Sequence, residues 1–493
     1  MIRNLFFALI LACASPNLVI AQEGFLDNSF ADSNGYRTAN FDFVPGGSSG
    51  DNATAVARSE DGRLTIVGGF RRVSSDNFDC GVMRLLPDAG FDTSFAAPDG
   101  FRTLALNLGG NNVDICYDLT VLADGSTWIA GFSRTAPTVN SGFVIRLLAN
   151  GDVDSNFFSD GVFLFNDDLP AGVSLSSIAY DVAVDSQGRV LVAGAIVRGI
   201  APAQSNRGIV LRFLADGSLD PDFAAGGFAE LADFNPPQVN IFAVAEDSQG
   251  RLLAAGSTFS AFPNQGVAVV FRLLANGAQD TSFGTGMTAL GGGGRGFVPG
   301  CTYFPRGLHL DASDRILALC QAASLPAPAP APPVQLIRLL ASGLPDLNFG
   351  SAGVAPIAFE YNAAGTAIGM TSELAQILTQ ADGKVLVTGT HRAAVPADWG
   401  AGDIGVLRLL PNGNPDPSFG QDRGASLFRF IGRLQRQENA AAALLEPGGR
   451  MVIVGSLARA PVAGSSNLTD FLVMAVRTAN APLPDPLFAD NFE

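Results

Sequence analysis

The 493-residue sequence has few of the side chains that enzymes use for acid–base or nucleophilic chemistry. It contains two histidines, His309 and His391, and one lysine, Lys384. The H-E-x-x-H pattern of zinc proteases does not occur in it. We therefore expect a protein that is not an enzyme, and a glycosidase that uses carboxylates such as Glu360 and Glu373 is the alternative.

Cysteine is scarce as well, with five residues, and neither a C-x-x-C pattern nor a Cys/His cluster is present. A structural zinc site is therefore not expected. Four cysteines follow the N-terminal segment, an even number that allows two disulfides in an exported protein, with three possible pairings. Cys301 and Cys320 fall on neighbouring expected strands, and Cys80 and Cys116 begin strands of adjacent repeats. The candidate disulfides are therefore Cys80–Cys116 and Cys301–Cys320.

Positive charge is in short supply, because 30 Lys and Arg face 46 Asp and Glu, giving a net charge of −16. A nucleic-acid partner is not expected, since binding it requires a basic surface. Apolar residues make up 47% of the chain and charged residues 15%, which indicates a folded protein with a large core. After the N-terminus no run of 18 uncharged apolar residues occurs, so no transmembrane segment is expected.

The N-terminus resembles an export signal. Arg3 precedes an apolar run at 5–14, which is too short to span a bilayer, and small residues suggest cleavage after Ala21. Residues 1–21 are therefore interpreted as a signal peptide, and the mature protein as secreted, periplasmic or on the cell surface. An alternative is a lipid anchor at Cys13, because residues 10–13 loosely match a bacterial lipobox.

Three sequence markers repeat in phase along the rest of the chain, about every 65 residues. A D-x-x-F motif occurs at 27–30, 92–95, 154–157, 220–223, 280–283, 346–349 and 416–419. A turn and a β-rich run that usually ends in Gly occur at 61–68, 124–131, 187–194, 249–256, 313–320, 382–389 and 448–455. An R-L-L-like strand and turn occur at 83–90, 145–152, 211–218, 271–278, 337–344 and 407–414, with a degenerate copy at 473–481.

Each unit has the pattern of four short antiparallel strands. In the third unit the strands are expected at 178–185, 189–194, 209–214 and 227–234. Seven copies of such a unit without helical periodicity indicate an all-β, seven-bladed β-propeller over residues 22–480. The first copy of the fourth strand, near 36–44, precedes every first strand. We therefore expect the N-terminal strand to complete the last blade and close the ring.

The repeated residues are interpreted as structural. The Phe of D-x-x-F is expected in the core, and the Arg of the R-L-L strand is expected to pair with the repeated Asp. No cofactor is expected. Calcium at acidic groups such as Asp216, Asp220 and Asp222 is one alternative, and an anion-binding ring of the arginines is another. His309 is expected to be a packed residue of a strand.

Binding is expected on one face of the ring. The connections after the second and fourth strands of each unit are long and differ between units, as at 71–79, 197–207, 291–305, 324–334, 361–373 and 391–403. A constant scaffold with variable loops on one face is typical of binding surfaces. The candidate contact residues in these loops are Tyr303, Phe304, His391 and Trp399.

The unit consensus, D/Q-G-R/K-V-L-V-A-G, then R-L-L-x-N/D-G, then D-x-x-F-G, resembles the delta-60 repeat family of bacterial proteins over residues 24–480. Departures are Cys320 for Gly and the degenerate last R-L-L strand. Residues 481–493 resemble a short tail of exported proteins. The resemblance implies an exported or surface-associated repeat protein, and no catalytic residues to carry over.

Together these observations favour a monomeric, exported binding propeller with a glycan or protein ligand on the variable-loop face. A passive envelope component and a carbohydrate-active propeller enzyme are the alternatives.

Overall fold

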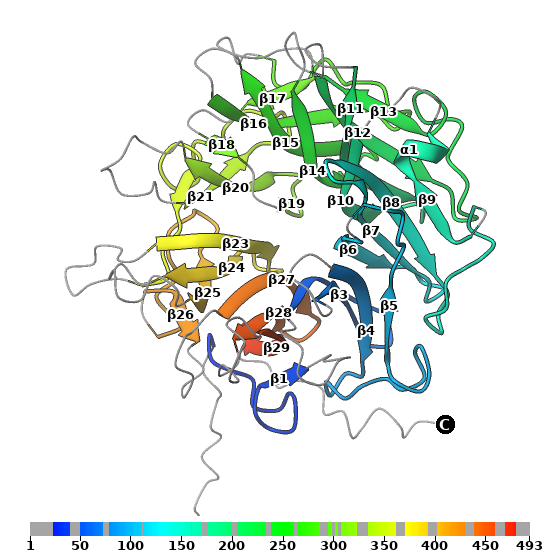
Figure 1. Cartoon of the computed structure of the whole chain (residues 1–493). Coiled ribbons are helices and arrows are strands. Elements are labelled where there is room, and N and C mark those ends of the chain that lie inside the picture. The colour runs from blue at the N-terminus through cyan, green and yellow to red at the C-terminus, as the bar shows by residue number, and fades with distance from the viewer. Residues whose placement is uncertain are drawn as a thin grey trace, which may run out of the picture.

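The computed structural model describes residues 23–39, 50–71, 78–110, 112–158, 160–169, 176–199, 205–232, 238–260, 265–285, 294–297, 301–303, 307–322, 334–360, 370–392, 402–421, 423–428, 438–458 and 469–479. These residues form seven sheets arranged as a ring, which is a seven-bladed β-propeller with antiparallel strands (Figure 1). The all-β fold and the number of blades expected from the repeats are therefore confirmed.

The blades are numbered 1 to 7 along the chain, and each has strands A to D from the centre outwards (Figure 1). The A strands are β2 (Asp51–Arg58), β6 (Asp114–Val121), β10 (Ser176–Val184), β14 (Val239–Glu246), β18 (Cys301–Tyr303) with β19 (Leu308–Leu310), β23 (Met370–Thr379) and β27 (Glu438–Glu446). The B strands are β3 (Leu64–Arg71), β7 (Thr127–Ala136), β11 (Val190–Arg198), β15 (Leu252–Ser260), β20 (Ile316–Ala322), β24 (Val385–Arg392) and β28 (Arg450–Ala458).

The outer half of each blade consists of strands C and D. The C strands are β4 (Phe78–Leu85), β8 (Val139–Leu147), β12 (Ser205–Phe213), β16 (Gln265–Leu273), β21 (Val334–Leu339), β25 (Gly402–Leu409) and β29 (Thr469–Arg477). The D strands are β5 (Phe101–Leu104), β9 (Val162–Leu164), β13 (Phe228–Leu231), β17 (Arg295–Phe297), β22 (Val354–Pro356), β26 (Ala425–Phe428) and β1 (Tyr36–Ala39), and the one-turn helix α1 (Phe165–Asp168) follows β9.

The ring is closed by the N-terminal strand. β1 pairs antiparallel with β29, in register from Tyr36 opposite Met474 to Ala39 opposite Phe471. Blade 7 thus has the order β27-β28-β29-β1, so its outer strand comes from the beginning of the chain. This pairing covers an edge that would otherwise be open to other strands.

The core lies between the blades. The described buried apolar side chains form seven clusters, each shared by two neighbouring blades. The largest fully buried side chain is Trp128, in the cluster between blades 2 and 3. Within the described residues no helix is long or apolar enough to cross a bilayer.

The repeated Gly of strand B has a steric reason. A bulge in strand A presses a backbone carbonyl against it, and a Cβ on Gly131 would lie 2.0 Å from the Ile115 oxygen. Gly455 in blade 7 would meet the Asn439 oxygen at 1.8 Å. A larger residue would require the backbone of strand A to shift, because real Cβ atoms do not approach so closely.

Blade 5 shows what happens where this Gly is replaced. Cys320 occupies the position, and the A strand of this blade is interrupted between β18 and β19. Cys320 is joined to Cys301 of β18, with 5.4 Å between their Cα atoms. The second disulfide, Cys80–Cys116, joins blade 1 to blade 2 across a Cα separation of 5.2 Å. Both pairs are the ones expected from the sequence.

Candidate functional site

The ring has two faces of different character. The A–B turns and C–D connections lie on one face, which we call the turn face. The B–C and D–A connections lie on the other, which we call the loop face.

On the turn face the repeated Arg of strand C pairs with the Asp of D-x-x-F. In blades 1 to 6 the Arg Nε lies 2.7 to 3.4 Å from an Asp carboxylate oxygen. In five of these blades the guanidinium also covers the Phe of the motif, 4.3 to 4.6 Å from the ring centre. The expected Arg–Asp pairing and the burial of these Phe rings are both observed.

The same arginines hold neighbouring blades together. Each guanidinium in blades 1 to 6 donates a hydrogen bond of 2.5 to 3.3 Å to a backbone carbonyl in the next blade. Between blades 7 and 1, where the repeat is interrupted by the chain ends, Arg37 of β1 donates to the Ala89 carbonyl. The anion-binding ring considered from the sequence is therefore replaced by contacts within the scaffold.

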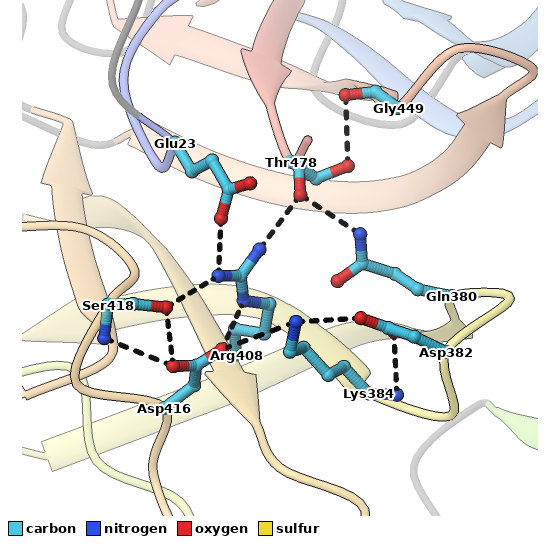
Figure 2. A network of polar contacts seen from close by, with 9 residues as sticks. All are labelled: Glu23, Gln380, Asp382, Lys384, Arg408, Asp416, Ser418, Gly449 and Thr478. Atoms are coloured by element: carbon cyan, nitrogen blue, oxygen red, sulfur yellow. Dashed lines mark hydrogen bonds and ion pairs between the residues drawn. The ribbon is translucent and has the colours of Figure 1, made fainter. Parts of the chain in front are cut away.

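Figure 2 shows this unit where blade 6 meets blade 7. Arg408, with a side chain that is 1% exposed, pairs with Asp416 at 2.9 Å and donates to the Thr478 carbonyl at 2.8 Å. Its guanidinium also contacts the Glu23 carboxylate. Asp416 accepts further hydrogen bonds from the Ser418 amide and hydroxyl. The N-terminal segment is thereby attached to blade 6 as well as to blade 7.

The last repeat is completed by the first motif of the chain. Arg477 of β29 pairs with Asp27 at 2.8 Å, and Phe30 is fully buried in the cluster between blades 7 and 1. In unit seven Ala475 occupies the place of the repeated Arg, since its carbonyl accepts from the Asp27 amide as the Arg84 carbonyl accepts from the Asp92 amide. Arg477, two residues later, supplies the cation for the D-x-x-F motif of residues 27–30.

These carboxylates predict a loss of stability in acid. Burial raises the pKa of Asp416, but hydrogen bonds from Ser418 and the charge of Arg408 outweigh it, and the pKa lies below its ordinary 3.8. The pKa of Asp280 is lowered in the same way by Ser282 and Arg272. Because the folded pKa is depressed, this stabilisation is complete above the unfolded pKa and is lost as the pH falls through the folded pKa.

We expect the free energy of unfolding to fall below about pH 4. Urea unfolding measured from pH 7 to pH 3 tests this, with Asp280→Asn as the variant that removes one titrating group. A free energy that stays constant to pH 3, or an acid dependence identical in Asp280→Asn, would contradict the assignment.

The acidic groups considered for calcium have structural partners on the turn face. Asp220 pairs with Arg212 at 2.8 Å, and Asp216 accepts hydrogen bonds from Ser218. Among the residues that the structure describes, no group of three His, Cys, Asp or Glu side chains could hold a metal ion.

Near the loop face one row of equivalent positions carries different residues in different blades. This row lies two residues beyond the repeated Gly of strand B and includes its partners on strands A and C. In blade 1 the row is Asp51, Phe70 and Asp79. The equivalent rows are Asp114, Ser133 and Ser141 in blade 2, Thr371, His391 and Asp403 in blade 6, and Glu438, Leu457 and Asp470 in blade 7.

Carboxylates therefore occupy this row in four consecutive blades, 6, 7, 1 and 2, and all are at most 9% exposed. The equivalent rows contain no carboxylate in the next two blades. They are Ser177, Ile196 and Arg207 in blade 3, and Val239, Thr258 and Val267 in blade 4. Asp114 accepts hydrogen bonds from the amides of Leu106 and Asn107, at 2.9 and 3.4 Å, in the connection before β6. This buried carboxylate anchors the connection that leads into its own blade.

His391 differs from the expectation that it begins a loop. It lies in β24 opposite Asp403 of β25, because the hairpin continues beyond the expected end of its strands. The side chain is 1% exposed, and its Nε2 lies 3.0 Å from Oε2 of Glu360, a side chain that is 32% exposed. Its Nδ1 has no hydrogen-bond partner among the described residues. His391 therefore positions a partly exposed carboxylate on the loop face and does not itself present a contact surface.

The other candidates have different positions. Tyr303 is the last residue of β18, the first part of the interrupted A strand of blade 5, and does not lie in a loop. Phe304 and Trp399 lie outside the described residues, as do the proposed signal peptide, Cys13 and the tail at 481–493. His309 lies in β19, where its Nε2 is 2.8 Å from the Thr379 hydroxyl, and burial lowers its pKa.

Three aromatic residues were missed by the sequence analysis. They are half-buried and lie on the A strands of three consecutive blades: Tyr117 in blade 2, Tyr180 in blade 3 and Phe242 in blade 4. The ring of Tyr180 contacts both of the other rings. The signal that could have identified them is their identical place in three consecutive repeats, immediately after the small or apolar residue that precedes each bulge.

Four segments of the chain match a family described as a domain of unknown function, DUF5122, beta-propeller: residues 122–157, 186–223, 248–283 and 380–419. They belong to blades 2, 3, 4 and 6 and end at the Phe of D-x-x-F. The matches support a family of β-propeller repeats. No curated protein matches the chain.

Solved structures with a similar fold include propellers of different activities. An exo-1,5-alpha-L-arabinanase from a bovine ruminal metagenomic library is 10% identical, covering 64% of this chain and all of that one, with a TM-score of 0.32. The GH93 alpha-L-arabinofuranosidase of Fusarium graminearum is 8% identical, covering 78% and 98%, with a TM-score of 0.38. The propeller domain of the Trilobed protease from Pyrococcus furiosus is 9% identical, covering 92% and 100%, with a TM-score of 0.39.

The expectation that the chain is not an enzyme is contradicted by this comparison, because the similar structures include propeller glycoside hydrolases. At these TM-scores the likeness carries no inference about a particular reaction or substrate.

Proposed function

We propose that this chain is an exported propeller that binds a glycan on its loop face. The observation that carries the proposal is the difference between the two faces. On the turn face the same Arg, Asp and Phe recur in blades 1 to 6 and hold the ring together. On the loop face equivalent positions carry different polar side chains from blade to blade. Variation confined to one end of a constant scaffold is how binding surfaces are built.

The charge of the protein favours a neutral or amino-bearing ligand. With a net charge of −16 and six buried carboxylates in the loop-face row, polyanions are repelled. Carboxylates accept hydrogen bonds from the hydroxyl groups of sugars, and Glu360 presents such a group with partial exposure. Export is part of the proposal, and two disulfides agree with an oxidising compartment. We assign the repeats to the delta-60 type on the consensus of their three markers.

A glycan array probed with the exported chain tests the proposal. Wild type is expected to bind, and Glu360→Gln is expected to weaken binding by about tenfold, because a charged acceptor is lost. Asp216→Asn, which removes an exposed acid from a turn-face turn, is the matched control and should bind like wild type.

The same array is read for released reducing ends, which would show that a bound glycan is also cleaved. An array without binding, or equal weakening by Glu360→Gln and Asp216→Asn, would overturn the proposal. A passive envelope protein would give the first of these results.

A further inference from the structure

The A strands of blades 2, 3 and 4 carry a continuous aromatic surface. Tyr117 of β6 lies 5.4 Å from Tyr180 of β10, and Tyr180 lies 5.0 Å from Phe242 of β14, measured between ring centres. All three side chains are half-buried. The A strands are the innermost strands of their sheets, so the three residues belong to the strands that border the centre of the propeller (Figure 1).

Each of these residues occupies the bulge of its strand. The pairing with strand B shifts between Cys116 and Asp118, so that Tyr117 is the extra residue, and Tyr180 and Phe242 are placed in the same way. Bulges re-aim side chains and are frequent next to functional sites.

The fold itself does not require an aromatic residue at the bulge. Blades 1 and 7 form the same bulge with Thr54 and Ala441. Thr54 donates a hydrogen bond of 2.9 Å to the Cys116 carbonyl of the neighbouring A strand. In blades 2 and 3 the residue after the bulge makes the equivalent link, because Asp118 accepts from the Val182 amide at 3.1 Å and Asp181 from the Val244 amide at 2.7 Å. The contact between neighbouring A strands is thus provided without the aromatic rings.

We infer that Tyr117, Tyr180 and Phe242 form a stacking surface for the sugar rings of a neutral or amino-bearing oligosaccharide. The inference rests on the proposed function and specifies which residues hold the ligand. Aromatic faces carry partial negative charge and bind the C–H faces of sugars, whereas the net charge of −16 disfavours acidic glycans. Asp114 begins the same strand as Tyr117, three residues nearer the loop face, which is about 10 Å along the strand.

The test uses substitutions that this ring already contains. Tyr117→Thr and Phe242→Ala introduce the bulge residues of blades 1 and 7, so the fold is expected to tolerate them. Phe158→Ala is the matched control, because Phe158 is 37% exposed and follows D-x-x-F on the turn face. Thermal unfolding of each variant shows that it is folded before binding is measured.

Calorimetry with the hexasaccharides of glucose, N-acetylglucosamine and glucosamine, and with oligogalacturonate, gives the result. We expect at least one of the first three ligands to bind. Oligogalacturonate should bind more weakly than that ligand or not at all. Tyr117→Thr and Phe242→Ala should each raise Kd about tenfold, and Phe158→Ala should leave it unchanged. Saturation transfer from aromatic protons to sugar C–H protons should be lost together with the affinity.

The failures are distinguishable. Unchanged affinity in Tyr117→Thr and Phe242→Ala, with wild type binding, would overturn the stacking surface and leave the proposed function standing. Tighter binding of oligogalacturonate than of any of the three hexasaccharides would overturn the charge argument and the inference. Absence of binding to all four ligands by wild type would overturn both this inference and the choice of glycan as the ligand.

Discussion

Deletion of residues 23–39 is expected to open the ring and to make the protein aggregate under conditions in which the intact chain is folded. The deletion removes β1, so that β29 becomes an exposed edge strand. It also removes Phe30 from the core between blades 7 and 1, and both Asp27 and Glu23 from their arginine partners. Size-exclusion chromatography of the deletion variant and the intact chain measures the effect.

The single substitution Phe30→Ala isolates the packing component of this closure. Because the ring is fully buried, the substitution should lower the free energy of unfolding by about 3–5 kcal/mol. Leu347→Ala, at a side chain that is 73% exposed, is the control and should change it by less than about 0.5 kcal/mol. Equal urea midpoints for the two variants, or a monomeric deletion variant, would show that the N-terminal segment does not close the ring.

Arg408→Ala is the second substitution for which we expect a large effect. Removing a guanidinium that is 1% exposed leaves the buried Asp416 with only Lys384, 4.0 Å away, as a cation and takes a hydrogen bond from the Thr478 carbonyl of blade 7 (Figure 2). Breaking a buried ion pair in this way costs about 3–5 kcal/mol. Urea unfolding at pH 7 measures the difference.

The control for Arg408→Ala is Arg102→Ala. Arg102 forms an ion pair with Asp152, and the two side chains are 31% and 53% exposed, respectively. Exposed pairs contribute at most about 1 kcal/mol, so this variant should unfold close to wild type. A loss of stability in Arg408→Ala no greater than in Arg102→Ala would contradict the role that we assign to the repeated arginines.

The fold could be predicted because its repeated residues have local physical causes. The Gly of strand B is needed where the bulge of strand A approaches, and the Phe of D-x-x-F fills the space between blades. The order of the markers along the chain then determines how the ring closes, since residues 27–39 have a D-x-x-F motif and an outer strand but no inner strands of their own.

Strand ends on the loop face could not be predicted in the same way. The hairpin of blade 3 extends to Arg198 and resumes at Ser205, beyond the expected ends at 194 and 209. The expected ends were placed at the repeated Gly of strand B, and the residues beyond that Gly differ from blade to blade. In β11 the strand continues past Gly194 with Ile196 buried in the core between blades 2 and 3, which the repeat does not indicate. For this reason His391 was expected in a loop and is found in a strand.

The candidate site depends on contacts that are invisible in a linear pattern. The pairing of His391 with Glu360 joins residues 31 positions apart in sequence, in two blades. The contact between Tyr117 and Tyr180 joins neighbouring repeats at one shared position. The three aromatic residues can be read from the sequence, but the bulge that each of them occupies is found only in the pairing of strands A and B.

The most direct test of the proposed function is the location of the bound ligand. Hydrogen exchange of the exported chain would be followed with and without whichever of the glucose, N-acetylglucosamine or glucosamine hexasaccharides binds it. We predict slower exchange in the A strands near residues 114–118, 177–181 and 239–243 and in the loop-face row around 402–404, with no change in the turns at 59–63, 122–126 and 185–189. Protection confined to those turns would place the ligand on the opposite face and contradict the account.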